Sequence, residues 1–180
     1  MAPSCANELK EMMDFAFTLD SPVAIRYPKE EAWQNPAYSK PLHFAKSYCL
    51  QKGEKTAIVS VGTMLDISLE VAKFLENSGQ IPSLYNARFV KPIDKTFLDE
   101  LIGYSYIFTI EDHTAVGGFG SSLCAQIMQH RKTKGSFPLI YPFAFPDIFI
   151  ETGTRQELFS RYDLTAPSIV QKIQNIIKEK

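Results

Sequence analysis

The stretch that decides the fold runs from residue 56 to residue 79 and reads TAIVSVGTMLDISLEVAKFLENSG. Its first six residues form an apolar run rich in β-branched side chains, which ends at Gly62 as a buried strand does. Apolar side chains then return at helical spacing between positions 66 and 77, and Gly79 stands where a glycine commonly ends a helix. The stretch therefore predicts a strand followed directly by a helix.

The same alternation continues towards the C-terminus. We expect further strands at 82–87 (with 89–90), 106–110 and 139–145, and further helices at 92–101, from Gly120 through Leu123, Ile127 and Met128, and from about 165 to 177. A chain in which strands and helices alternate folds as a mostly parallel sheet with helices on both faces and right-handed crossovers. The predicted fold class is α/β.

The residues before this stretch follow a different pattern. Asn7 can cap a helix that ends near Asp20, and residues 23–25 indicate a short buried strand that stops at Pro28. Periodicity is then lost between positions 29 and 55, where proline, glycine, charged and aromatic residues are mixed.

A loop of that length is uncommon inside one compact domain, so a domain boundary explains it better. We therefore expect the tail of one domain at 1–30, a linker at 31–52 and a complete α/β domain at 53–180. The aromatic side chains of Trp33, Tyr38 and Phe44 would hold the linker to a surface.

Composition and charge exclude several classes of protein. The 180 residues are 45% hydrophobic and 22% charged, which excludes disorder as the main state. A net charge of -1 argues against a nucleic-acid or anionic membrane partner. The longest uncharged stretch, 113–130, is too polar to cross a bilayer, and residues 1–12 are too charged for a secretion signal. We expect an intracellular protein that binds small molecules or another protein.

Cysteine usage and the common catalytic motifs point to no metal or nucleophile site. Cys5, Cys49 and Cys124 are far apart and form no C-x-x-C pair, which fits a reducing compartment without disulfides or structural zinc. The chain also lacks a phosphate-binding P-loop, an H-E-x-x-H zinc motif and a G-x-S-x-G nucleophile motif.

Gly118, Phe119 and Gly120 lie between a predicted strand and a predicted helix, where glycines can let backbone N–H groups approach a phosphate. The third glycine of a dinucleotide-binding motif would fall at Leu123, and no strand-end carboxylate follows at the required distance. A tight turn that packs the helix on the sheet is the favoured interpretation.

Glu111, Asp112 and His113 stand together at the end of a predicted strand, where α/β sheets commonly bind ligands. Three adjacent side chains cannot all point into one pocket, so a capping or interface role is favoured over catalysis. We expect His43 and His130 to lie on the surface without a chemical role.

Arg26 is the most informative candidate, in the segment PVAIRYP at 22–28. It follows a predicted buried strand and precedes a rigid proline, so its guanidinium could present several fixed donors to a phosphate or carboxylate. The residues alone favour a surface salt bridge slightly over a ligand contact.

Several motifs, in order along nearly the whole chain, resemble the 1-deoxy-D-xylulose-5-phosphate synthase family. They are MAPS (1–4), SPVAIRYP (21–28), GTM (62–64), NARFVKPID (86–94), ED with GGFGSS (111–122) and FPDIFIETG (145–153). The pair SPVAIRYP and NARFVKPID is specific, because transketolases and the β subunits of 2-oxoacid dehydrogenases differ in the second segment.

The resemblance implies a transketolase-like fold, with residues 1–30 as the tail of a pyrimidine-binding domain and residues 53–180 as the C-terminal domain. It implies an enzyme that condenses pyruvate with glyceraldehyde 3-phosphate, releases CO₂ and serves isoprenoid, thiamine and pyridoxal biosynthesis. Thiamine diphosphate and Mg²⁺ would be its cofactors, and the cofactor supplies the electron sink. Arg26 would hold the phosphate of glyceraldehyde 3-phosphate. A cytoplasmic or plastid homodimer is implied.

This chain departs from the family pattern in ways that bear on activity. It contains no Gly-Asp-Gly motif for Mg²⁺ and diphosphate, and the catalytic glutamate of the family would lie upstream of Met1. Lys29-Glu30 replaces the usual Arg-Gly, and Thr152-Gly153 replaces the usual His-Gly. We therefore expect this chain alone to be inactive and to bind neither thiamine diphosphate nor Mg²⁺. The alternative is a free-standing, non-catalytic module for assembly or ligand sensing.

Overall fold

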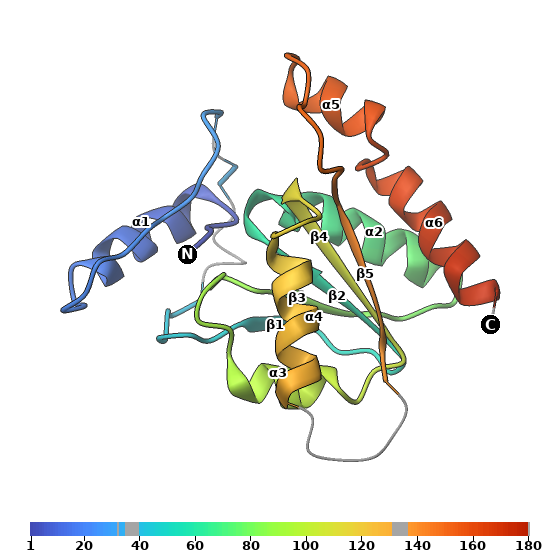
Figure 1. Ribbon diagram of the computed structural model, residues 1–180, viewed down its shortest axis with the longest axis horizontal. Coiled ribbons are helices and arrows are strands. Elements are labelled where there is room, and N and C mark those ends of the chain that lie inside the picture. Colours follow the sequence, from blue (N-terminus) through green and yellow to red (C-terminus); the bar gives the residue numbers. More distant parts are fainter. Residues whose placement is uncertain (32, 35–39, 131–136, 180) are drawn as a thin grey trace.

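The computed structural model describes residues 1–31, 33–34, 40–130 and 137–179 (Figure 1). Tyr38, expected to hold the linker to a surface, lies outside this part of the chain. The elements are, in chain order, α1 (Ala6–Ala16), β1 (Tyr48–Gln51), β2 (Thr56–Ser60), the 3₁₀ helix η2 (Gly62–Met64), α2 (Leu65–Asn77), β3 (Ser83–Asn86), α3 (Lys95–Leu101), β4 (Tyr106–Thr114), α4 (Phe119–His130), β5 (Leu139–Phe145), α5 (Arg155–Arg161) and α6 (Ala166–Lys178).

The strands form one five-stranded sheet in the order β1-β3-β2-β4-β5. Strands β3, β2, β4 and β5 run parallel to one another, and β1 pairs with β3 in the antiparallel direction. The predicted α/β class and the mostly parallel sheet are therefore confirmed. The parallel strands end together at one edge of the sheet, where ligands of such folds commonly bind.

Each face of the sheet packs on its own set of helices, as the alternation of side chains in β2 shows. Ile58 points into a core shared with α2, α5 and α6, whereas Ala57 and Val59 point into a core shared with α3 and α4. Figure 1 shows α4 and α3 in front of the sheet and α2 behind it. Helices on both faces, as predicted, bury most residues of the central strands β3, β2 and β4.

The elements differ from the sequence-based prediction at several points. Helix α1 follows Cys5 as its N-cap residue, so Asn7 lies inside the helix and is not its cap, and the helix ends at Ala16 and not near Asp20. Strand β1 lies inside the expected linker 31–52, so the sheet begins before residue 53. Helix α5 was not expected, although Thr154 and Glu157 form a capping box that its sequence spacing announces. Residues 23–25 form no strand, because within the described part of the chain their segment exchanges backbone hydrogen bonds with Met1 alone.

The N-terminal segment packs against the sheet through a buried ion pair. Glu8 in α1 accepts hydrogen bonds from Arg88 Nε at 2.7 Å, from Asn86 and from Ser4. Arg88 also donates to the carbonyl oxygens of Lys40 and Pro41. These bonds join three distant segments of the chain at the end of β3.

No helix in the described part of the chain has the length and apolar character needed to span a membrane.

Candidate functional site

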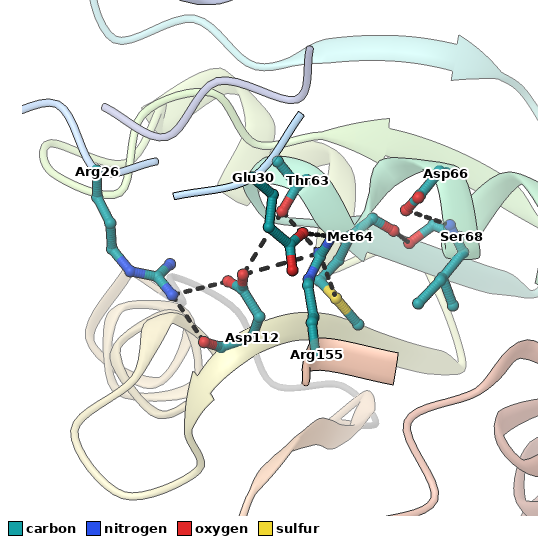
Figure 2. Close-up of polar contacts among 9 residues, drawn as sticks. Arg26, Glu30, Thr63, Met64, Asp66, Ser68, Asp112 and Arg155 are labelled. Carbon is teal, nitrogen blue, oxygen red and sulfur yellow. Dashed lines mark hydrogen bonds and ion pairs between the residues drawn. The ribbon is translucent and has the colours of Figure 1, made fainter. Parts of the chain in front are cut away.

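Four polar side chains from four segments meet at the edge where the parallel strands end (Figure 2). Arg26 comes from the extended segment after α1, Thr63 from η2 after β2, Asp112 from the end of β4 and Arg155 from the first turn of α5. Parallel pairing of β2 with β4 places the ends of these two strands side by side, which brings Thr63 and Asp112 together.

Asp112 holds the guanidinium of Arg26 by one nitrogen. Nη2 of Arg26 donates to the backbone oxygen and to Oδ1 of Asp112, both at 2.7 Å. The Arg26 side chain is 46% exposed, whereas that of Asp112 is 14% exposed. Nε and Nη1 of Arg26 have no partner in the part of the chain that the structure describes. The salt bridge that the residues alone favoured is present, and donors remain free for an anion.

Arg155 approaches the same carboxylate from the other side. Its Nη2 donates to Thr63 Oγ1 at 2.7 Å and lies 3.8 Å from Asp112 Oδ2. Thr63 Oγ1 in turn donates to Asp112 Oδ2 at 3.5 Å. Nη1 of Arg155 lies 3.4 Å from Glu30 Oε2, so Glu30, which departs from the family pattern, pairs with this arginine.

Two adjoining cavities open beside these residues. A small one of about 90 Å³ is lined by Arg26, Tyr27, Pro28, Gly62, Thr63 and Asp112. A larger one of about 330 Å³ shares Tyr27, Pro28 and Thr63 with it and reaches Trp33, Asp66 and Arg155. Burial raises the pKa of the Asp66 carboxyl, against the opposing effects of the Ile67 amide and of Arg155. The site therefore combines a half-exposed cation with a partly enclosed space.

Glu111, Asp112 and His113 point in different directions, as expected. Glu111 is buried and accepts hydrogen bonds from the backbone amides of Phe119 and Gly120 at 2.7 and 2.8 Å. Burial raises the pKa of this carboxyl, although these two amides lower it. His113 is exposed. Glu111 thus caps α4, which confirms the capping interpretation.

Glycine at positions 118 and 120 leaves room for the Glu111 carboxylate at the start of α4. A Cβ on Gly118 would lie 2.7 Å from Glu111 Oε2, and a Cβ on Gly120 would lie 3.0 Å from Glu111 Oε1. The N–H groups that could have bound a phosphate are therefore occupied by a side chain of the protein. The tight-turn interpretation is confirmed, and the phosphate-loop interpretation is wrong.

The remaining candidate residues lie outside this site. His130 pairs with Asp99 at 2.7 Å on the surface, and His43 is exposed. All three cysteines are free, with Cys5 buried and Cys49 and Cys124 partly buried.

Sequence reasoning missed Thr63, Arg155 and the buried pair Glu8 and Arg88. Thr63 follows a predicted strand directly, a position that could have marked it. Arg155 follows the capping-box threonine, which would have placed it at the start of a helix. Nothing in the sequence pairs Glu8 with Arg88, because they are distant in the chain and meet only in the fold.

The described residues contain no carboxylate cluster of the kind that would hold Mg²⁺. No group of three or more His, Cys, Asp or Glu side chains among them is arranged to hold a metal ion. Asp112, which lines the smaller cavity, is already shared between two arginines. The expectation of thiamine diphosphate and Mg²⁺ therefore remains a prediction about the whole enzyme.

The curated proteins that the chain resembles share one name. The chain is 35% identical over 184 residues to the 1-deoxy-D-xylulose-5-phosphate synthase of Natranaerobius thermophilus, covering 99% of this chain and 28% of that protein. It is 36% identical over 181 residues to the synthase of Caldanaerobacter subterraneus subsp. tengcongensis, again covering 99% of this chain and 28% of that protein. The chain thus spans little more than a quarter of the length of the curated relatives it matches.

Solved structures agree on the fold. A chain described as "Split gene transketolase, inactive beta4 tetramer" superposes with a TM-score of 0.82 at 28% identity, covering 97% of this chain and 56% of that one. The transketolase of Campylobacter jejuni superposes with a TM-score of 0.68 at 17% identity, covering 97% and 25% of the two chains. This second likeness concerns the fold alone.

A family model matches the sheet and its helices directly. The model described as "Transketolase, C-terminal domain" covers residues 45–169, a range that starts just before β1 and ends within α6. With the parallel sheet, the helices on both faces and the relatives above, this match shows that the chain belongs to the transketolase C-terminal domain family.

Proposed function

We propose that this chain forms the C-terminal part of a 1-deoxy-D-xylulose-5-phosphate synthase. The whole enzyme would condense pyruvate with glyceraldehyde 3-phosphate and release CO₂, as a thiamine-diphosphate-dependent transferase that supplies isoprenoid biosynthesis. The curated relatives that match 99% of the chain carry that name, which supports the assignment.

Arg26 is the residue through which the chain would act on the substrate. The observation that carries this role is its geometry: a half-exposed guanidinium, fixed through Nη2 at the rim of a cavity, whose Nε and Nη1 have no partner in the described part of the chain. Such a group binds a phosphate dianion through charge-assisted hydrogen bonds that a lysine ammonium does not reproduce. Arg26 would thus hold the phosphate of glyceraldehyde 3-phosphate.

The rest of the site would come from outside the described residues. Residues 1–30 would belong to the pyrimidine-binding domain, and Mg²⁺ and the cofactor diphosphate would be held by a domain absent from this chain. The cofactor would supply the electron sink for loss of CO₂. The assembled enzyme would be a cytoplasmic or plastid homodimer, and this chain alone would be inactive and bind neither cofactor.

The test is steady-state kinetics on an assembled enzyme. This chain would replace the matching C-terminal part of the Natranaerobius thermophilus synthase, and each substrate would be varied in turn. Loss of contacts to a charged phosphate costs about 2 to 4 kcal/mol, or roughly 30- to 1,000-fold. Arg26→Ala should raise the KM for glyceraldehyde 3-phosphate by that factor, Arg26→Lys should recover part, and the KM for pyruvate should change little.

The control is Arg161→Ala, because Arg161 is an exposed arginine of α5 that pairs with Glu151 away from the cavities. It should leave both KM values unchanged. An unchanged KM for the phosphorylated aldehyde in Arg26→Ala, or an equal loss for both substrates, would return Arg26 to a structural role.

A second candidate is a non-catalytic module that uses this fold for assembly or ligand sensing. One observation favours it: the 28% identical split-gene transketolase chain is described as an inactive β4 tetramer. Sequencing the transcript upstream of Met1 distinguishes the two. A continuous reading frame that encodes a Gly-Asp-Gly motif and the catalytic glutamate supports the synthase, and a stop codon followed by a start at Met1 supports the module.

A further inference from the structure

The contacts at the end of β4 form one connected chain of polar groups. It runs from Arg26 to Asp112, from Asp112 to Thr63, and from Thr63 to Arg155 in α5 (Figure 2). Its two ends come from segments that are far apart in the sequence, before the sheet begins and after it ends. These contacts therefore connect Arg26 to α5 although the two are not in direct contact.

The bond geometry shows what this chain of groups does to Arg26. Nη2 of Arg26 donates two hydrogen bonds to Asp112, at 2.7 Å each, one to the backbone oxygen and one to Oδ1. Two bonds to one nitrogen fix the plane of a guanidinium, and Nε and Nη1 have no partner among the described residues. A free arginine side chain would lose considerable rotamer entropy on binding an anion, and this one has already lost it.

The second carboxylate oxygen of Asp112, Oδ2, is contacted by Thr63 and Arg155. Oδ2 accepts from Thr63 Oγ1 at 3.5 Å and lies 3.8 Å from Arg155 Nη2, while Arg155 Nη2 is fixed by Thr63 at 2.7 Å. Arg155 is itself anchored, since its guanidinium lies 4.7 Å from the centre of the Phe159 ring and pairs with Glu30. Asp112 therefore lies between the half-exposed guanidinium of Arg26 and the mostly buried guanidinium of Arg155.

We propose that Asp112, Thr63 and Arg155 are positioning residues for Arg26, and that they pre-orient its guanidinium for the phosphate of the substrate. The link to phosphate rests on the proposed function, whereas the ordering of the Arg26 guanidinium by these three residues does not. None of the three needs to touch the substrate.

The test uses the 180-residue chain and the NMR signal of the Arg26 side-chain Nε–H group. Thr63→Val is the key variant, because it keeps the shape and changes no charge while it removes the hydroxyl that joins Asp112 to Arg155. Arg155→Gln breaks the same path from its far end. Arg161→Gln is the matched control, since it removes an arginine from the same helix but not from this path.

We expect Thr63→Val and Arg155→Gln to lower the order parameter of the Arg26 guanidinium and to speed its hydrogen exchange. Titration with inorganic phosphate should show binding about three- to tenfold weaker in both variants, as for neighbours within one hydrogen-bond network. The control should match the unmodified chain in both measurements.

Three results would overturn the positioning role. The first is an Arg26 guanidinium as ordered in Thr63→Val and Arg155→Gln as in the unmodified chain. The second is a loss of order with unchanged phosphate affinity. The third is tighter phosphate binding in Asp112→Asn, which would make Asp112 a competitor of the anion. If the Arg26 guanidinium is ordered but its NMR signal does not change on titration with phosphate, the proposed function is contradicted. The positioning of Arg26 by Asp112, Thr63 and Arg155 is then still supported.

Discussion

Gly120 shows at the scale of one residue how tightly the start of α4 is packed. A Cβ there would lie 2.4 Å from Thr109 Oγ1 and 3.0 Å from Glu111 Oε1. Gly117, three residues earlier, has a φ of +75° but open space around it. The two glycines therefore serve different needs, one for space and one for backbone conformation.

Gly120→Ala should accordingly lower the free energy of unfolding by about 2 to 3 kcal/mol through overpacking. Gly117→Ala should lower it by about 1 kcal/mol, the cost of a left-handed backbone in a residue with a Cβ. Urea denaturation of both variants measures the two costs. An equal effect, or a larger one at Gly117, would show that Glu111 and Thr109 move aside and that the cap is loosely held.

At the scale of the element, the stability of α3 depends on its N-cap residue, Asp94. Asp94 accepts a hydrogen bond from the backbone amide of Thr96 at 3.0 Å and forms an ion pair with Lys46 at 2.9 Å. Burial raises the pKa of the Asp94 carboxyl, but the hydrogen bonds from Lys46 and Thr96 outweigh burial and hold the pKa below its usual value of 3.8.

Because the folded pKa lies below the unfolded one, the ionised Asp94 stabilises the fold above about pH 3.8, and this contribution is lost as the pH falls through the folded value. Asp94→Ala should cost about 1 to 2 kcal/mol at pH 7, as for other helix caps. The difference from the unmodified chain should shrink at pH 3. Asp94→Asn keeps the cap acceptor and should lose less. Urea denaturation at both pH values tests this, and a difference that grows at pH 3 would contradict it.

At the scale of the whole molecule, the pair of Glu8 and Arg88 ties the N-terminal segment to the sheet. Both side chains are buried, with 0% and 3% exposed. Ala2 donates its amide to the Arg88 carbonyl, and Arg26 donates its amide to the Met1 carbonyl, so the segment that carries Arg26 is tied to the end of β3.

Arg88→Met should leave an uncompensated charge on buried Glu8 and cost about 3 to 5 kcal/mol. The Glu8→Gln, Arg88→Met double variant should recover part of that cost. Hydrogen exchange should show lost protection in α1 and little change in β2 and β4. If the double variant is no more stable than the single one, the pair does not act as a charge couple, and if β2 loses protection as readily as α1, the segment is not a separate unit.

The sequence by itself determined the α/β class, the parallel strands from β2 to β5 and the helices that alternate with them. These follow from hydrophobic periodicity, which is a local property of 10 to 20 residues. It also marked Arg26 and explained why Glu111, Asp112 and His113 cannot act together, because side chains alternate along a strand. The capping box that announces α5 was present as well, and it was overlooked.

Only the tertiary structure decided which residues meet. Strand β1 is four partly buried residues without a pattern, and it becomes a strand only because β3 offers a free edge. Residues 23–25 have the sequence of a strand but do not form one, because no neighbouring strand pairs with them in the part of the chain that the structure describes. The pairs Arg26 with Asp112 and Glu8 with Arg88 are separated by 86 and 80 positions. Local patterns carry no information about such partners, because only the packing of the sheet and helices sets the distance between them.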